Sequence, residues 1–186
     1  MLHIITALYR PELLKLIHES LPDAPDITWH IGMSVDKDLD YVPADLRVKI
    51  YKIDCEDKES WTKRQKCLDK VDNGYYCFLD DDTIFHHQMY NEYKRLKSSN
   101  YKGMIIGEQV FKDGRRRLKP KRPMFCQIDI GNVLSHHSVN QHVKFPSKLK
   151  NTPSARDYEY WKKVYKFYKN QAVLVYKTIS IYNGLR

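Results

Sequence analysis

Cysteine is scarce in this sequence, and its cysteines are widely spaced. The 186 residues include only Cys55, Cys67, Cys77 and Cys126, with no C-x-x-C pair. Structural zinc sites need closely spaced ligands, and disulfide frameworks are typical of small secreted domains. The spacing therefore argues against both, and we expect reduced thiols, mostly packed in the interior of a cytosolic protein.

Glycine, proline and long apolar runs are also few. With 7 Gly and 8 Pro, the sequence is neither collagen-like nor of low complexity. No apolar run approaches the roughly 20 residues of a membrane-spanning helix. The N-terminal segment Met1–Ile5 lacks the basic and long apolar regions of a signal peptide. We therefore expect a globular protein located in the cytoplasm.

Positive charge, in contrast, is in excess. The chain carries 32 Lys and Arg against 23 Asp and Glu, a net charge of +9, with 42% hydrophobic residues. This balance and this length suit one folded domain with a full hydrophobic core. A positive field attracts a nucleic acid and a nucleotide diphosphate alike, so charge alone does not identify the partner.

Hydrophobic periodicity predicts alternating strands and helices over the first 110 residues. The expected strands are Leu2–Leu8, Ile27–Val35, Leu46–Ile53, Tyr75–Leu79 and Lys102–Ile106, and the expected helices are Glu12–Leu21, Ser60–Val71 and Met89–Leu96. This order predicts an α/β fold with helices on both faces of a central sheet. Such sheets bind ligands at the carboxyl ends of their strands.

The rest of the chain has a different pattern. Lys112–Pro123 is basic and rich in turn residues, with a candidate hairpin turn at Asp113-Gly114. We further expect a short strand or turn over Gln127–Leu134, a loop over Pro146–Pro153, a helix over Arg156–Tyr168 and a strand over Ala172–Tyr176.

Three adjacent carboxylates come after the most apolar of the expected strands. Tyr75–Leu79 leads directly into Asp80, Asp81 and Asp82. Like charges this close disfavour one another's ionisation, so a cation is expected nearby. Carboxylates at positions i and i+2 can converge on one Mg²⁺ or Mn²⁺ ion, which also takes phosphate oxygens. A solvated acidic turn is the alternative, and five preceding apolar residues argue against it.

This part of the sequence resembles the metal motif of GT-A glycosyltransferases, in which an apolar strand is followed by Asp-x-Asp, a short loop and a helix. The resemblance implies one GT-A (Rossmann-like) domain with a mixed central sheet. Residues 1–110 would bind the nucleotide-sugar, and residues 111–186 would form the acceptor and catalytic half. Asp80 and Asp82 would hold Mn²⁺ or Mg²⁺ against the donor diphosphate, with Asp81 between them as a donor-binding residue.

The first predicted strand extends this resemblance to the nucleotide. Ile4–Pro11 is similar to the first strand and loop of family-2-type enzymes, which implies donor-binding roles for Thr6, Leu8 and Arg10. Asp36 comes at the end of the second predicted strand, where that family often has an acid for the base or ribose. An ordinary polar strand end is the alternative for Asp36.

Two more segments resemble parts of the donor site. Thr62–Gln65 is similar to a segment near the nucleotide, with Gln65 in place of the usual Asn. Arg64 would then pair either with a phosphate or with a carboxylate of the acidic triplet. Gln127–Asn132 is similar to a segment that approaches the donor sugar, which makes Asp129 a candidate sugar contact.

Asp157 is the candidate general base by the same resemblance. Asp157–Trp161 is similar to the acidic-aromatic motif of the late helix, although Arg156 replaces the first acid of the usual Glu-Asp pair. The Asp of that motif deprotonates the acceptor in inverting enzymes, and Glu159 is the second choice. A helix N-terminus would keep Asp157 ionised and lower its basicity. The alternative is that Asp157 only interacts favourably with the helix dipole. A transfer that retains the anomeric configuration would need no such base, and we favour inversion.

These observations favour a metal-dependent hexosyltransferase that moves a sugar from a nucleotide-sugar, most simply a UDP-sugar, to a glycan or other hydroxyl acceptor. A nucleotidyltransferase acting on a sugar phosphate is one alternative, but Ala7–Pro11 has no glycine for a phosphate loop. A non-enzymatic nucleic-acid-binding module is another. The acidic triplet would repel its phosphates, so we expect no nucleic-acid partner.

One basic segment is left without a role by this interpretation. Arg115–Arg122 carries six positive charges in eight residues. A solvated hairpin is the simplest interpretation. The alternatives are a site for anions such as nucleotide phosphates, acidic glycans or anionic lipid, and nucleic-acid binding.

Overall fold

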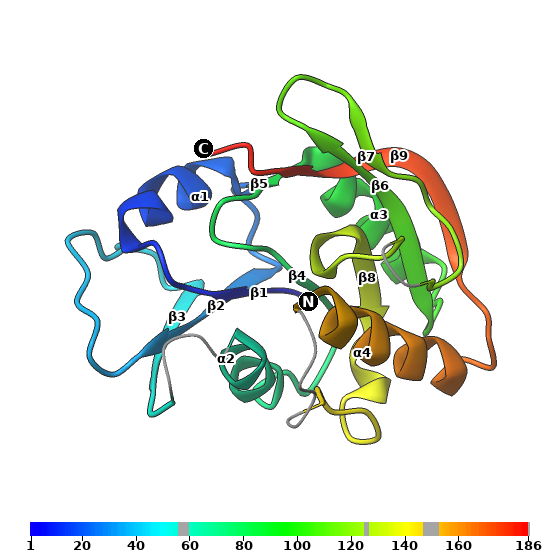
Figure 1. Cartoon of the computed structure of the whole chain (residues 1–186), viewed down its shortest axis with the longest axis horizontal. Coiled ribbons are helices and arrows are strands. Elements are labelled where there is room, and N and C mark those ends of the chain that lie inside the picture. Colours follow the sequence, from blue (N-terminus) through cyan, green and yellow to red (C-terminus); the bar gives the residue numbers. More distant parts are fainter. Residues whose placement is uncertain (56–59, 125–126, 147–152, 186) are drawn as a thin grey trace.

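A nine-stranded mixed sheet forms the centre of the molecule, with helices against both of its faces (Figure 1). The computed structural model describes residues 1–55, 60–124, 127–146 and 153–185. The α/β fold expected from hydrophobic periodicity is therefore confirmed. The division into a nucleotide-binding half and an acceptor half stays a prediction.

Four parallel strands form one side of this sheet. They are β1 (Leu2–Ala7), β2 (Ile27–Ser34), β3 (Val48–Ile53) and β4 (Tyr75–Phe78). Their order across the sheet is β3-β2-β1-β4, with parallel pairing throughout. Because parallel strands end at the same edge, the segments after β1, β2 and β4 emerge there together.

The other side of the sheet mixes strand directions. It contains β8 (Val133–His136), β6 (Met104–Phe111), β9 (Val173–Tyr182) and β5 (Ile84–Phe85), in that order after β4. β8 is antiparallel to both β4 and β6, whereas β9 is parallel to β6. A short β7 (Arg116–Leu118) forms a hairpin with β6.

The helices divide between the two faces of the sheet. On one face lie α1 (Leu14–Ser20), which comes after the 3-10 turn η1 (Pro11–Leu13), and α3 (His87–Ser98); on the other lie α2 (Ser60–Leu68) and α4 (Pro153–Phe167). Neighbouring strand residues alternate between the two cores: Ile4 packs toward α1 and Ile5 toward α2. The central strands β1 and β4 are buried on both faces, which explains why they appear as apolar runs in the sequence.

Several boundaries differ from the sequence-based expectation. β6 continues five residues past Ile106, and β9 continues six past Tyr176, because each pairs along the other. The two-residue β5 was not expected, since so short a strand has no periodicity. Residues Gln127–Leu134 divide between the 3-10 turn η2 (Ile130–Asn132) and the start of β8, and a second such turn, η3 (His137–Val139), comes after β8.

The predicted hairpin turn at Asp113-Gly114 is confirmed. Gly114 adopts a positive φ of 82°, which favours glycine, and β7 returns antiparallel along β6. Cys67 and Cys77 are buried free thiols, and Cys55 is half-buried. Cys126 and most of the loop predicted over Pro146–Pro153 lie outside the described residues. No helix in the described part of the chain has the length and apolarity to cross a membrane.

Candidate active site

The acidic triplet lies where β4 leaves the middle of the sheet. All four residues of β4 are buried between β1 and β8. Beyond them the three carboxylates separate: the side chains of Asp81 and Asp82 are 2% and 3% exposed, whereas that of Asp80 is 25% exposed. The triplet is therefore not a solvated acidic turn, because two of its members are buried.

Asp81 binds the loop after β1. Its Oδ2 accepts hydrogen bonds from the backbone N–H groups of Tyr9 (2.6 Å) and Arg10 (2.8 Å), and its Oδ1 accepts from Arg10 Nε at 2.9 Å. Arg10 Nη2 also pairs with Asp81, and Arg10 Nη1 lies 2.7 Å from Asp82 Oδ2. In this structure Arg10 and Asp81 pair with each other, and their predicted contacts with the donor stay predictions.

Arg64, in α2, joins Asp80 to Asp157. Its Nη2 pairs with Asp80 Oδ1, and its Nη1 lies 3.5 Å from Asp157 Oδ1 in α4. The Arg64 residue is only 8% exposed. Burial alone would lower the pKa of its guanidinium, but the two carboxylates raise it well above its ordinary value. The sequence left open whether Arg64 pairs with a phosphate or with a carboxylate of the acidic triplet. In this structure it pairs with the carboxylate of Asp80.

Both carboxyl groups held by Arg64 titrate near neutral pH. Burial raises the pKa of Asp80 to about 6 and that of Asp157 to about 7; repulsion from Asp129 adds to both, and Arg64 opposes both. The sequence-based expectation of a lowered basicity at Asp157 is wrong. α4 begins at Pro153, so Asp157 lies beyond the first turn, where the helix dipole is weak and burial decides.

Asp129 completes the group of acids and brings in a third arginine. Its Oδ1 accepts from Gly131 N (3.0 Å) and caps η2, and its Oδ2 lies 2.9 Å from Arg117 Nη1. Arg117 comes from β7 of the basic hairpin and stacks over the Tyr182 ring at 3.7 Å. In the sequence Arg117 is one of the six basic residues of Arg115–Arg122. No sequence feature distinguishes it from the other five as the partner of Asp129.

The groups joined by these ion pairs are not balanced in charge. They comprise five carboxylates and three guanidinium groups, those of Asp80, Asp81, Asp82, Asp129, Asp157, Arg10, Arg64 and Arg117. We call these eight residues the carboxylate cluster. Its excess of two acids raises the cost of ionising Asp80 and Asp157 and favours a bound cation. Within the described residues, however, no three His, Cys, Asp or Glu side chains are grouped closely enough to hold a metal ion by themselves.

Thr6 and Leu8 lie in the core beside this cluster. Thr6 is fully buried, and its Oγ1 accepts a hydrogen bond from Trp29 Nε1 at 2.9 Å. The Leu8 side chain is 1% exposed, and its carbonyl accepts from Lys63 Nζ at 3.3 Å. In this structure their side chains pack within the core, and their predicted donor-binding roles stay predictions.

Asp36 and Glu159 stand apart from the cluster. Asp36 is exposed in the turn after β2, at the expected strand end, and no ion pair joins it to the cluster residues described here. Its contact with the nucleotide stays a prediction. Glu159 pairs with Lys162 at 3.6 Å. Because each helical residue turns by about 100°, Glu159 points away from the side of α4 that presents Asp157.

The comparisons with known proteins identify the fold through structure alone. No family model and no curated protein sequence matches the chain. The solved structure of S. aureus TarS 1–349 matches 97% of this chain with a TM-score of 0.70 at 14% identity. Its complexes with UDP-GlcNAc and with UDP match with TM-scores of 0.69 and 0.70, also at 14% identity.

The match leaves a large part of TarS uncovered. This chain spans 59% of TarS 1–349, and 57% and 59% of the chains in the UDP-GlcNAc and UDP complexes. TarS is a GT-A-type glycosyltransferase. The likeness extends over nearly the whole of the present chain and confirms the predicted fold class: this protein has the mixed sheet and flanking helices of the GT-A fold.

Proposed function

We propose that this protein is a glycosyltransferase that moves a sugar from a nucleotide-sugar, a UDP-sugar, to a hydroxyl acceptor. The GT-A fold supports the proposal, as does the presence of UDP and UDP-GlcNAc in the TarS complexes. The observation that carries it is the Arg64 bridge. It holds an acid from the exit of β4 and an acid from α4 against one guanidinium.

Asp157 is the proposed general base. A carboxyl group with a pKa of about 7 is partly ionised at neutral pH and still basic enough to accept a proton. In the transfer, Asp157 takes the proton of the acceptor hydroxyl while that oxygen bonds to the anomeric carbon. The bond from this carbon to the diphosphate oxygen breaks, and the nucleoside diphosphate leaves with the electron pair. We propose that the transfer inverts the anomeric configuration, because a retaining transfer needs no such base.

Asp80 and Asp82 are the proposed protein ligands of Mn²⁺ or Mg²⁺. Mg²⁺ is commonly held by one or two carboxylates together with substrate phosphates and water, so a three-acid protein site is not required. The carboxylate cluster contains more acids than arginines, which favours a cation at this place. When bound, the ion neutralises charge on the leaving diphosphate. Arg64 keeps Asp80 in place beside that position.

Donor binding that depends on the metal is the direct test. In a thermal-shift experiment, UDP and UDP-GlcNAc should stabilise the wild type only when Mn²⁺ is present. Ligand at about 100 times its Kd adds about 2.7 kcal/mol of stability. For a protein of this size that raises the melting temperature by about 5–10 °C. Asp80→Asn should lose this shift, because asparagine is a weaker metal ligand.

The matched control is Asp23→Asn, which changes an exposed acid on the surface and should keep the full shift. A shift that persists in Asp80→Asn would remove Asp80 from the metal site. Stabilisation by ATP or another nucleoside triphosphate in place of UDP would point to a nucleotidyltransferase. Stabilisation by an oligonucleotide alone would point to a nucleic-acid-binding module.

A further inference from the structure

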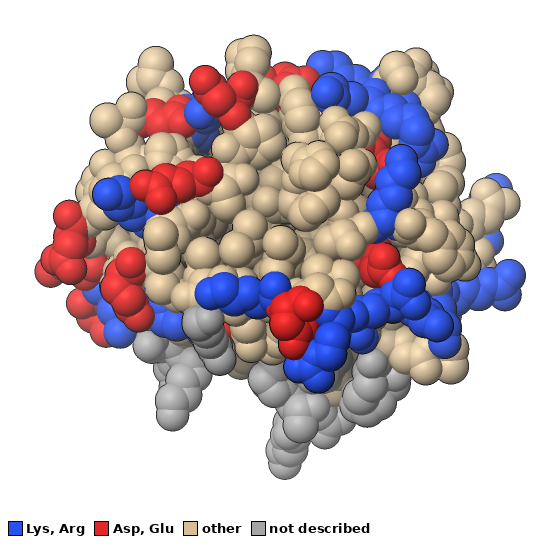
Figure 2. Space-filling model, turned by 90° about the horizontal axis from the view of Figure 1, so that it is seen from above, with Lys and Arg blue, Asp and Glu red and all other residues tan. Residues whose placement is uncertain are grey.

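The charge of the chain is divided unevenly along its length. Residues 1–90 contain 11 Lys and Arg against 17 Asp and Glu, whereas residues 91–186 contain 21 against 6. The two parts lie on different sides of the molecule. In Figure 2 acidic side chains gather on the left, where α1 and β3 lie, and basic ones predominate on the right. The molecule therefore has a basic side and an acidic side, which orients it near an anionic surface.

The hairpin arginines contribute little to that basic side. Arg115 pairs with Asp113 at 2.7 Å, Arg116 pairs with Glu108, and Arg117 pairs with Asp129 at 2.9 Å. Each of these three arginines has its own acid. Nearby acids therefore neutralise Arg115–Arg117, the first part of the basic run Arg115–Arg122. The positive charge without nearby acids lies elsewhere.

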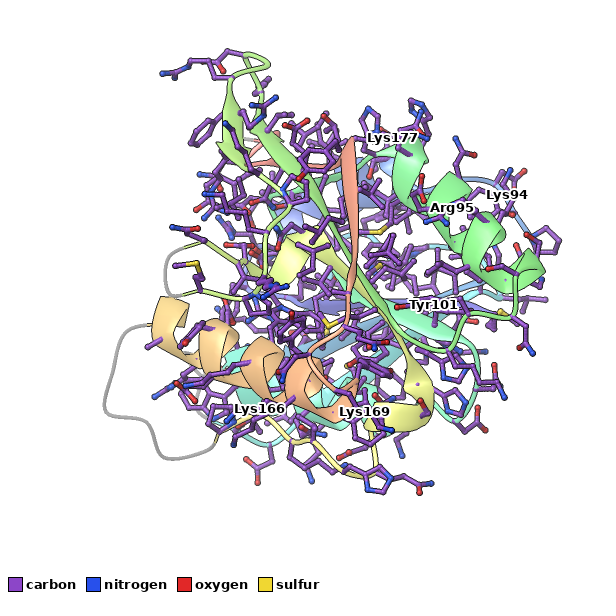
Figure 3. The ribbon with its side chains drawn as sticks, turned by 90° about the vertical axis from the view of Figure 1, so that its right-hand side faces the viewer. Lys94, Arg95, Tyr101, Lys166, Lys169 and Lys177 are labelled. Atoms are coloured by element: carbon purple, nitrogen blue, oxygen red, sulfur yellow. The ribbon has the colours of Figure 1, made fainter. Side chains whose placement is uncertain are left out.

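The uncompensated charge lies on the face formed by α3, β9 and the end of α4. Figure 3 shows Lys94, Arg95 and Lys177 toward one end of this face and Lys166 and Lys169 toward the other. All five are exposed. Residues 93–107 and 160–185, which build most of the face, contain no acid. Glu92 pairs with Arg95 (2.7 Å) and Lys177 (3.3 Å), but it is 3% exposed and neutralises only one of the two. We call this surface the lysine face.

Exposed apolar side chains lie on two of the same elements, β9 and the end of α4, where the Phe167 ring stacks on His142. Tyr176 and Leu174 of β9 are 73% and 36% exposed, and Phe167 at the end of α4 is 38% exposed. A bulge presents Tyr176: between two β6 pairs, Ile106 with Leu174 and Glu108 with Thr178, β9 gains two extra residues. Bulges bend a strand and can redirect its side chains.

We propose that the lysine face binds an anionic lipid bilayer peripherally. Lysines on the same face as an exposed tyrosine and an exposed leucine match the two layers of a membrane interface. The ammonium groups reach anionic headgroups, and the apolar groups enter the boundary below them. Exposed Leu174 favours a lipid over a nucleic acid, which would use the cations and tyrosine but gain little from leucine. The proposal concerns membrane attachment and does not depend on the proposed transfer reaction.

Vesicle co-sedimentation tests this attachment. Wild-type protein should bind vesicles of phosphatidylcholine containing about one-third phosphatidylserine, and should not bind vesicles of phosphatidylcholine alone. A triple variant, Lys94→Gln, Lys166→Gln and Lys169→Asn, should bind roughly 100-fold more weakly, since each basic residue near the surface contributes about fivefold. Asparagine is chosen at position 169 because Lys169 has a φ of +53°, which asparagine tolerates.

The matched control removes three exposed lysines outside the lysine face, Lys49→Gln, Lys70→Gln and Lys112→Gln. It has the same net charge as the triple variant and should bind vesicles within about twofold of wild type, since surface charge acts only over a Debye length. Tyr176→Ser should weaken binding several-fold in a way that added salt does not change. Asp157→Asn, which disables the proposed base, should bind vesicles like wild type.

Two results would overturn the proposal. One is an equal loss of binding in the two triple variants, which would reduce the effect to net charge. The other is binding of single-stranded RNA that the lysine-face variant abolishes, with no binding to anionic vesicles, which would assign the face to nucleic acid.

Discussion

Replacement of Asp157 by asparagine is expected to lower the rate of sugar transfer by about 10²–10⁴-fold, the usual contribution of a general base. Asparagine keeps the size of the side chain and can still accept a hydrogen bond from Arg64, but it cannot take the acceptor proton. Donor binding should be unchanged, because Asp157 belongs to α4 and not to the loop after β4. Transfer measured with UDP-GlcNAc and a panel of hydroxyl acceptors, alongside the thermal shift, separates the two effects.

The pH dependence of the rate should identify the same group. Burial raises the pKa of Asp157 to about 7, so the carboxylate required of a base is lost as the pH falls below neutrality. The wild-type rate should therefore fall about tenfold per pH unit well below pH 7 and level off above it. The slow residual rate of the variant should lack this step. Bound metal would shift the step to lower pH, because a nearby cation favours the ionised carboxyl.

Glu159→Gln is the control within the same helix. Glu159 pairs with Lys162 and faces away from Arg64, so its replacement should leave the transfer rate near that of wild type. A large loss in Glu159→Gln together with little loss in Asp157→Asn would make Glu159 the base. If neither variant loses activity, no base of α4 takes part, and a product of retained anomeric configuration would explain why.

The raised pKa values of Asp80 and Asp157 also affect stability. Their folded-state values of about 6 and 7 exceed the ordinary 3.8, so the folded protein binds more protons than the unfolded chain at intermediate pH. The stability that these protons confer is complete below about pH 4 and is lost as the pH rises toward 7. Urea unfolding at pH 5 and pH 8 should show a smaller loss in Asp157→Asn than in wild type.

The sequence predicts the acids of the site well because their placement is local. An apolar run such as Tyr75–Leu79 must be a buried strand, and the residues after a buried parallel strand emerge at the ligand-binding edge of the sheet. The position of the acidic triplet can be deduced from that rule and from residue order alone. The structure agrees with this deduction. All of Tyr75–Leu79 is buried, its first four residues form β4 between β1 and β8, and Asp80 follows directly.

The partners of these acids could not be predicted in the same way, because they are distant in sequence. Arg10 is 71 residues from Asp81, and Arg64 is 93 residues from Asp157. Hydrophobic periodicity fixes which face of a helix is buried but not which guanidinium meets which carboxylate. A family resemblance gave Arg10 a role at the donor, and the sequence offered no sign of the backbone N–H groups that also bind Asp81.

Runs of like charge in the sequence also fail to predict where the charged surfaces of the folded protein lie. The six basic residues of Arg115–Arg122 are conspicuous in the sequence, yet three of them meet acids in the fold. The lysine face is assembled from α3, α4 and β9, whose lysines are scattered over more than 80 positions. Such a patch depends on the register of β9 against β6, which two bulges interrupt and which no local pattern reveals.

Loss of the Arg10 guanidinium should have the largest effect on stability. Arg10→Ala removes the guanidinium that pairs with Asp81 and Asp82, both of which are almost fully buried. Breaking a buried ion pair in this way costs about 3–5 kcal/mol, and we expect about 3 kcal/mol because the Arg10 side chain is 28% exposed. For a chain of this length the melting temperature should fall by about 6–12 °C. Lys15→Ala, which breaks an exposed pair with Glu19, should change stability by less than about 0.5 kcal/mol.

Two further variants distinguish the ion pair from the side chain's packing. Arg10→Lys keeps the charge but cannot span two carboxylates with one planar group, so an intermediate loss is expected. Adding Asp81→Asn to Arg10→Ala should restore part of the stability, because the unpaired charge is removed while the neutral side chain still accepts the N–H groups of Tyr9 and Arg10. If Arg10→Ala instead leaves the melting temperature unchanged and weakens UDP-GlcNAc binding, then Arg10 contacts the donor, as the sequence resemblance implied. In that case the pairing with Asp81 must open when the donor binds.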